Sequence, residues 1–278
     1  MMVSNVYGFY ANLIGLLLPV VAAHSWVERL MRIHPNGTMV GKPGYIRATV
    51  SRLDPSFNDL QMQHLLPPND GVARSLTEQD RMCKESQTFG SYSPELPPLE
   101  ARAGDFIALQ YQENGHVTLP QNTPQKSSSG TVYIYSTSNP TDDDTLLSIH
   151  KIWNKQGTGG DGRGRLLATR PFDDGQCYQM NSGPLSMQRQ REFMKVPMDP
   201  QGGDLWCQND IRLPLDVRDS LTLYWVWDWP SSNPEMDEIY TSCMDIKIVP
   251  GTQDDGENFI DGQDLNTAAV KGQMQSGA

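Results

Sequence analysis

Positive charge is scarce in this sequence. Its 22 lysine and arginine residues stand against 33 aspartate and glutamate residues, so the formal net charge is −11. Nucleic acids are polyanions, and proteins bind them through clustered lysine and arginine. The charge balance therefore argues against a nucleic-acid partner, whereas a neutral polymer or a small ligand would meet no such repulsion.

Closely spaced cysteines are also missing. The four cysteines are Cys83, Cys177, Cys207 and Cys243, and no two of them have the short spacing found between ligands of structural zinc sites. An even number of cysteines suits two disulfides in an oxidising compartment. Four cysteines allow three pairings, and the sequence alone does not choose among them.

Long apolar runs are absent except at the N-terminus, in residues 11–23. This run is shorter than the ~20 residues of a membrane-spanning helix, and an asparagine and a proline interrupt it, which argues against the alternative of an uncleaved anchor. Val21 and Ala23 fit the small positions of a signal-peptidase site. We therefore expect residues 1–23 to be a signal peptide, the protein to be secreted without a membrane span, and His24 to become its first residue.

The apolar segments of the remaining chain are short and alternate with polar residues. Apolar side chains occupy every second position from Leu221 to Trp229, and a second alternating run extends from Tyr240 to Ile248. Twenty prolines disfavour long helices, and only residues 185–194 suit a short loop helix. These features predict an all-β fold, an immunoglobulin- or fibronectin III-like β-sandwich with long loops and two disulfides.

The predicted sandwich extends over residues 24–250. Residues 251–278 are rich in Asp, Gly, Gln and Asn, which predicts a disordered acidic and polar tail without a glycolipid anchor. Asn36 begins an Asn-Gly-Thr sequon and is a candidate for glycosylation. Residues 157–162 match a dinucleotide-binding glycine pattern, but neither a buried strand nor a crossover helix surrounds them, so we expect an exposed loop.

The tryptophans Trp225, Trp227 and Trp229 follow one another on one face of a predicted strand. Such a row could stack on sugars, but alternating aromatic residues more often form a core, because their burial is so favourable. We therefore predict that these three are buried. Trp26, close to the expected N-terminus, is the better-placed candidate for contact with a substrate at the surface.

Two histidines suggest a copper site. As the first residue, His24 would offer an α-amine and an imidazole to one metal ion, and an α-amine, with a pKa near ~7.7, loses its proton more readily than lysine does. His116 follows a predicted strand in a loop bounded by glycine and proline, where a sandwich exposes functional groups. Copper(II) favours tetragonal coordination by nitrogen and has the highest affinity of the divalent series. The alternative is that cleavage places a histidine at the N-terminus by chance.

These features together resemble the lytic polysaccharide monooxygenases of fungi, whose mature chains begin with a copper-binding histidine. The Gly115-His116-Val117 loop resembles the place of their second histidine. The strongest match is to the chitin-active group, in which a Trp-rich strand like that of residues 223–229 is followed by a segment like that of residues 238–245. The resemblance extends over residues 24–249, although the opening His-Ser-Trp-Val-Glu and the loop of residues 155–174 set this chain apart as a branch of its own.

The resemblance implies roles for two further residues and a pairing of the cysteines. Tyr240 would be the axial residue at the copper ion, and Glu238 the carboxylate that acts on the oxygen species. These two residues lie two apart, so on a strand they share a face. The same resemblance implies that Cys83 pairs with Cys243 and Cys177 with Cys207.

Two functions follow as hypotheses. The first is a secreted, monomeric copper enzyme that cleaves a polysaccharide oxidatively, with chitin, cellulose or a fungal-wall glucan as substrate and an external electron donor as partner. The second is a non-catalytic secreted copper-binding protein in copper uptake or cell-wall biology. Tyr240 and Glu238 favour the enzyme, because a pure copper carrier needs neither of them.

Overall fold

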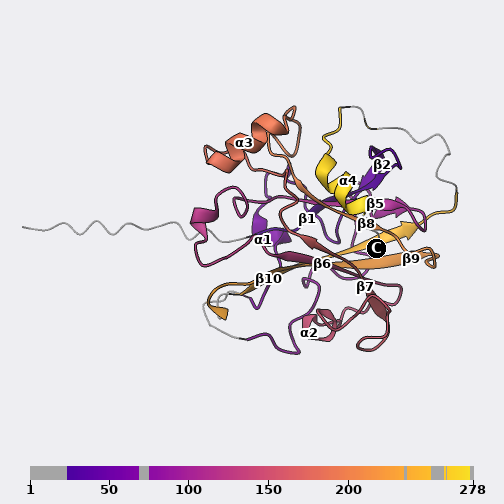
Figure 1. Ribbon diagram of the computed structural model, residues 1–278. Coiled ribbons are helices and arrows are strands. Elements are labelled where there is room, and N and C mark those ends of the chain that lie inside the picture. The colour runs from indigo at the N-terminus through magenta and orange to yellow at the C-terminus, as the bar shows by residue number, and fades with distance from the viewer. Residues whose placement is uncertain (1–23, 69–74, 235–236, 252–259, 261, 276–278) are drawn as a thin grey trace, which may run out of the picture.

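The computed structural model describes residues 24–68, 75–234, 237–251, 260 and 262–275 (Figure 1). The expected signal peptide lies outside the described residues. Within them, the chain forms two β-sheets packed face to face, which confirms the predicted β-sandwich. None of the helices in this described part is long and apolar enough to cross a membrane.

The smaller sheet has the strand order β2-β1-β5-β8, with all neighbours antiparallel. Its strands are β1 (Val27–Ile33), β2 (Met39–Gly44), β5 (Phe106–Tyr111) and β8 (Cys207–Arg212). Since β1 is an inner strand of this sheet, it fixes the position of the residues that precede it, His24 among them.

The larger sheet has the order β3-β10-β9-β6-β7, and β4 pairs with β10 in parallel. Its strands are β3 (Leu65–Leu66), β4 (Leu99–Ala101), β6 (Thr131–Thr137), β7 (Gly164–Pro171), β9 (Ser220–Trp229) and β10 (Glu238–Ile248). The two alternating segments of the sequence are therefore the neighbouring strands β9 and β10, as their period of two predicts.

The helices are short and lie outside the two sheets (Figure 1). They are α1 (Asp59–Met62), α2 (Leu146–Ile149), α3 (Pro184–Glu192), α4 (Thr267–Gln275) and the 3-10 turn η1 (Pro120–Asn122). The short loop helix expected within residues 185–194 is α3. Residues 157–162 form turns and bends between α2 and β7, so the glycine pattern does belong to a loop.

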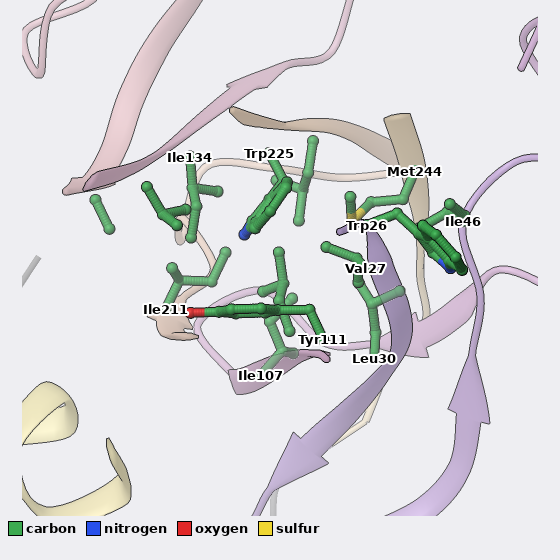
Figure 2. Close-up of a cluster of buried hydrophobic side chains, with 14 of the residues drawn as sticks. Trp26, Val27, Leu30, Ile46, Ile107, Tyr111, Ile134, Ile211, Trp225 and Met244 are labelled. Carbon is green, nitrogen blue, oxygen red and sulfur yellow. The ribbon is translucent and has the colours of Figure 1, made fainter. Parts of the chain in front are cut away.

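The core lies between the two sheets and is rich in aromatic residues. Trp225 packs against Tyr111 of the opposite sheet, with ring centroids 5.2 Å apart (Figure 2). Trp225, Trp227 and Trp229 are all buried, which confirms that they are core residues. Their indole N–H groups donate to protein oxygens, so burial leaves no polar atom of these side chains unsatisfied.

The outer face of the larger sheet carries a second apolar cluster, which the alternating pattern does not predict. It includes Tyr224 and Val226 of β9, Leu146 and Ile149 of α2, and Trp153 in the loop after α2. Side chains on both faces of β9 are thus buried, and loops that are long in sequence form a layer of their own.

The C-terminal segment covers the outer face of the smaller sheet. Helix α4 packs on β8, and the apolar cluster around Met31, Ile33 and Met39 is completed by Leu265 and Met274. The predicted disordered tail is therefore wrong for the described residues 262–275, because apolar side chains spaced along that segment find a partner sheet. Residues 252–259 of that predicted tail, together with 261 and 276–278, lie outside the described residues.

Two disulfides join distant parts of the sandwich. Cys83 pairs with Cys243, and Cys177 pairs with Cys207. Both pairings are the ones that the resemblance implies. The second disulfide links the start of β8 to the loop that leads into α3, and so connects the smaller sheet to the loops around His116. Asn36 is exposed in the turn between β1 and β2, and its glycosylation stays a prediction.

Asp210 makes the stability of the α4 region dependent on pH. Burial raises the pKa of its carboxyl from 3.8 to about 7, and its Oδ2 atom has no hydrogen-bond partner among the described residues. The folded state thus binds a proton that the unfolded state releases near pH 4, so stability falls as the pH rises from about 4 to 7. We expect Asp210→Asn to remove the part of this decrease in stability that Asp210 causes. In thermal unfolding, the melting temperature of the variant relative to the native protein should rise from pH 4 to pH 7; a constant difference would contradict the prediction.

Candidate metal centre

Two of the residues singled out in the sequence lie together although they are 92 positions apart. The main-chain nitrogen of His24 is 3.4 Å from Nε2 of His116. This separation exceeds that of an ordinary N–H hydrogen bond, whose donor and acceptor lie about 2.9–3.0 Å apart. After cleavage before His24, this nitrogen would be an α-amine facing an imidazole nitrogen.

The N-terminal residues are held in place by contacts from two other segments, the stretch after β5 and the strand β10. The side-chain amide of Asn114 donates to the carbonyl oxygen of His24 at 2.5 Å, and the Ser25 hydroxyl donates to the carbonyl oxygen of Gln112 at 2.8 Å. The main-chain N–H of Val27 donates to the hydroxyl of Ser242 at 3.1 Å. Because these contacts flank His24, its main-chain nitrogen is directed toward His116.

The loop that carries His116 is shaped by a tight turn at its start. Asn114 and Gly115 both have left-handed backbone conformations, with φ of +48° and +79°. Asparagine and glycine tolerate this conformation better than other residues do. The turn reverses the chain directly after β5 and brings His116 back over the N-terminal segment, so Asn114 both shapes the loop and binds His24.

Glu113 organises the same loop from within. Its carboxylate is buried and accepts hydrogen bonds from the main-chain N–H groups of Val117, Thr118 and Gln179, at 2.8, 3.2 and 2.8 Å. It also accepts one from the Thr118 hydroxyl. A single carboxylate therefore satisfies several donors directly after His116 and joins the His116 loop to the segment before α3.

Aromatic rings surround His116. Its ring lies 4.8 Å from that of Trp229 and 5.5 Å from that of Trp227, measured between centroids, and only 4% of the residue is exposed. Burial, the largest cause, together with the neighbouring His24 and Lys126 lowers the pKa of His116 to about 3. His116 is therefore a neutral imidazole at any ordinary pH, which is the form that binds metal ions.

Tyr240 and Glu238 lie on the same face of β10, the strand paired with β9, which carries Trp227 and Trp229. The Tyr240 ring stacks on Trp227 at 5.0 Å, so Trp227 lies against both Tyr240 and His116. Burial raises the pKa of the Tyr240 phenol well above its usual value, and burial also raises the pKa of the Glu238 carboxyl. Tyr240 is thus a neutral phenol. Glu238 lies beside Lys126, whose Nζ is 3.4 Å from Glu238 Oε2.

The His24 ring has two polar neighbours of its own. Its Nε2 lies 3.2 Å from Oδ2 of Asp59, the first residue of α1, and its Nδ1 lies 3.2 Å from the amide nitrogen of Asn114. Asp59 is also 3.7 Å from Arg52, which makes an ion pair with Glu28. The Asp59 carboxylate orients the imidazole, and a metal bound through Nδ1 would replace the contact with Asn114.

These residues fit a copper ion by their donor chemistry. Nitrogens that share one ion at about 2.0–2.1 Å lie about 2.9–4.1 Å apart for angles between 90° and 180°, and the observed 3.4 Å falls in that range. A cleaved His24 adds an imidazole in chelating position, and His116 supplies a neutral one. Among the described side chains, Asp174, Cys177 and Cys207 also converge, but these two cysteines form a disulfide and have no thiolate to offer.

Comparison with protein families gives one match that covers most of the chain. The family model described as "Domain of unknown function (DUF7492)" matches residues 21–271. The chain belongs to this family. The match begins three residues before His24 and includes most of α4, so in this family member the matched region contains the candidate site and much of the C-terminal segment. No curated protein matches the chain.

Several solved structures align with part of this family member. The copper(I) complex of CBM33 from Bacillus amyloliquefaciens is 9% identical, with a TM-score of 0.27, over 57% of this chain and 59% of that one. The copper complex of the cellulose-active monooxygenase CelS2 is 14% identical, with a TM-score of 0.30, over 66% and 71% of the two chains. An AA10 lytic polysaccharide monooxygenase from Streptomyces lividans is 12% identical, with a TM-score of 0.27, over 59% and 72%. The chain spans about three fifths of the length of the first of these proteins. At such scores the chemistry has to be argued from this chain's own residues.

One site residue expected from the sequence has a different role. Trp26 is only 2% exposed, so the predicted contact with a substrate at the surface is wrong. Its ring packs near Phe57, at 6.3 Å between centroids, and the Arg52 guanidinium lies 4.7 Å from the centre of the Trp26 ring. Trp26 directly precedes β1 and belongs to the core cluster between the two sheets, which proximity to the N-terminus does not indicate.

Four residues of the site were missed in the sequence: Glu113, Asn114, Lys126 and Ser242. Asn114-Gly115 is a common turn pair, and it could have predicted a tight turn directly before His116. Ser242 could have been predicted as the next residue after Tyr240 that faces inward on the same strand. Glu113 and Lys126 had no such signal, because their roles depend on how the loops close.

Glu113→Ala should destabilise the protein by about 3 kcal/mol or more, since it leaves three buried main-chain N–H groups without an acceptor. Copper affinity should also fall, because the His116 loop loses its internal support. Urea unfolding and a copper competition titration measure the two effects. Glu192→Ala, at the exposed end of α3, is the control and should change neither. A Glu113→Ala protein with native stability would show that the loop holds its shape without this carboxylate.

Proposed function

We propose that the secreted, cleaved chain binds one copper ion between His24 and His116 and acts as a lytic polysaccharide monooxygenase-like enzyme. The observation that carries this proposal is the 3.4 Å approach of the His24 main-chain nitrogen to His116 Nε2. These two atoms come from residues 92 positions apart, and separate sets of hydrogen bonds hold each of them in place. Such an arrangement suits a preorganised ligand pair better than a chance contact.

Copper bound there would supply one-electron redox chemistry toward an oxygen co-substrate. The protein's part is to hold and shield the ion. His116 offers a neutral nitrogen because its pKa is about 3. Trp227 and Trp229 exclude water from the side of His116 that faces the core. Tyr240 presents a neutral phenol beside Trp227 and would be a weak oxygen donor to the ion.

Glu238, paired with Lys126, is the candidate acid–base group of this arrangement. Burial raises the pKa of its carboxyl, and Lys126 opposes that shift. A carboxyl held in this way can hydrogen-bond an oxygen ligand or exchange a proton with it. The substrate would be a neutral polysaccharide, such as chitin, cellulose or a fungal-wall glucan, which the chain's net charge of −11 does not repel.

A non-catalytic copper-binding protein is the second candidate, and Asp59 favours it. Its carboxylate lies 3.2 Å from the His24 ring at an otherwise nitrogen-rich site. Its negative charge, next to the imidazole that would bind the ion, stabilises copper(II) over copper(I) and hinders the reduction that an oxygenase needs. A protein that stores or transfers copper(II) would gain from such a neighbour.

One experiment separates the two candidates. The cleaved protein is loaded with one equivalent of copper, supplied with ascorbate and peroxide, and incubated with chitin, cellulose and fungal-wall glucan. We expect oxidised oligosaccharides by mass spectrometry from the native protein and none from His116→Ala. Tight copper binding without products on any polymer would support the copper-binding protein instead. Weak copper binding, equal in the native protein and His116→Ala, would overturn both.

A further inference from the structure

Lys126 is a buried cation close to the candidate site, and it lies on the loop that follows η1. Its side chain is 2% exposed. Its Nζ donates a hydrogen bond to the main-chain carbonyl oxygen of Trp229 at 2.7 Å and lies 4.4 Å from the centre of the Trp229 ring. Both contacts fix the ammonium against the end of β9.

The same tryptophan ring touches His116. Their ring centroids are 4.8 Å apart, so Trp229 contacts both the candidate ligand and the Lys126 ammonium. On its other side, Nζ lies 3.4 Å from Oε2 of Glu238, an atom without exposed surface. Lys126 and Glu238 thus form a pair of opposite charges one ring away from His116.

The stability of the fold does not explain why Lys126 and Glu238 are paired here. Removing two charges from water costs more free energy than their attraction regains unless the geometry is very good, and apolar side chains of similar size often serve better. The 3.4 Å contact is longer than a usual charge-assisted hydrogen bond of about 2.7–2.9 Å. The pair is therefore poorly explained as a structural clamp, while its position suits an electrostatic effect on the neighbouring site.

We propose that Lys126 and Glu238 are a balanced charge pair that sets the preference of the site between copper(I) and copper(II). The inference rests on the proposed function, because it assumes copper at His24 and His116. A fixed positive charge disfavours the dication more than the monocation, and a fixed negative charge does the opposite. In a poorly solvated site each charge changes the ratio of the copper(I) and copper(II) affinities by about tenfold. Lys126 is thus a positioning residue that acts on the ion through the field of its charge.

The test compares three variants of the cleaved protein: Lys126→Met, Glu238→Gln and the double variant. Affinities for copper(I), without oxygen, and for copper(II) are measured by competition with chromophoric chelators. We expect Lys126→Met to shift the ratio about tenfold toward copper(II), and Glu238→Gln to shift it about tenfold toward copper(I). The double variant removes both charges and should return close to the native ratio.

The opposite signs of the two single shifts distinguish this role from a structural one. If the pair only supported the fold, both single variants would weaken the copper(I) and copper(II) affinities together and leave their ratio unchanged. Lys126→Arg keeps the charge and should keep the native ratio. If Lys126→Met does not fold, Glu238→Gln still tests the sign, with Lys126→Arg as the control that keeps the charge. Ratios unchanged in copper-binding variants would overturn this inference, whereas absence of copper binding in the native protein would overturn the proposed function.

Discussion

Protein that begins at His24 should bind copper(II) at least about a hundredfold more tightly than protein with one extra residue before His24. The extra residue turns the α-amine into an amide, which keeps its proton at neutral pH and is no ligand in that form. Conversion of the amine into an amide removes one of the two nitrogens that lie 3.4 Å apart, and it also breaks the chelate of His24. Competition titration of the two forms measures the difference.

Two histidine variants serve as controls for this result. His116→Ala removes the second nitrogen and should weaken binding as the extension does. His34→Ala should leave binding unchanged, because the ring of His34 contacts Asn36 in the turn between β1 and β2 and lies outside the site. Equal affinity of the cleaved and extended proteins would show that the terminal amine is not a ligand, and the two-histidine arrangement would then have to be abandoned.

The architecture could be predicted as far as local patterns reach. The period of two in residues 221–229 and 240–248 indicates strands, because only a strand places alternate side chains on one face. The same pattern does not record what covers the other face. Tyr224 and Val226 look like outward-facing residues, yet distant loops bury them. Such coverage depends on tertiary packing, which no short window of sequence contains.

The candidate site, too, has residues that the sequence predicts and residues that only tertiary packing brings into place. His24 and His116 could be selected from chemistry, because a terminal histidine and a loop histidine make an unusual pair of ligands. The residues that hold them depend on loop closure. Glu113 lies three positions before His116, but its carboxylate acts by accepting hydrogen bonds from Gln179, 66 positions further along the chain. The buried position of Lys126 depends on β9 in the same manner.

Removal of residues 251–278 should lower the free energy of unfolding by about 3–5 kcal/mol. The described part of this segment covers Met31 and Met39 with Leu265 and Met274, and large-to-small changes at single buried sites already cost about 2–5 kcal/mol. Gln273 adds polar contacts, since its side chain accepts from the N–H of Asp210 at 2.7 Å and donates to the carbonyl oxygen of Gln208 at 3.0 Å. Urea unfolding of a chain that ends at Pro250 measures the loss.

A chain that ends at Gln275 keeps α4 and should have native stability, which makes it the matched control. A point variant separates docking from chain length. Ala269 is a buried residue of α4, and Ala269→Asp places a carboxylate there without a partner, so it should reproduce much of the loss. Because the C-terminal segment covers Met31 and Ile33 near the end of β1, while His24 precedes the start of that strand, copper affinity should change less than stability. Full stability of the chain that ends at Pro250 would mean that the sandwich folds without its C-terminal layer, as a predicted domain of residues 24–250 requires.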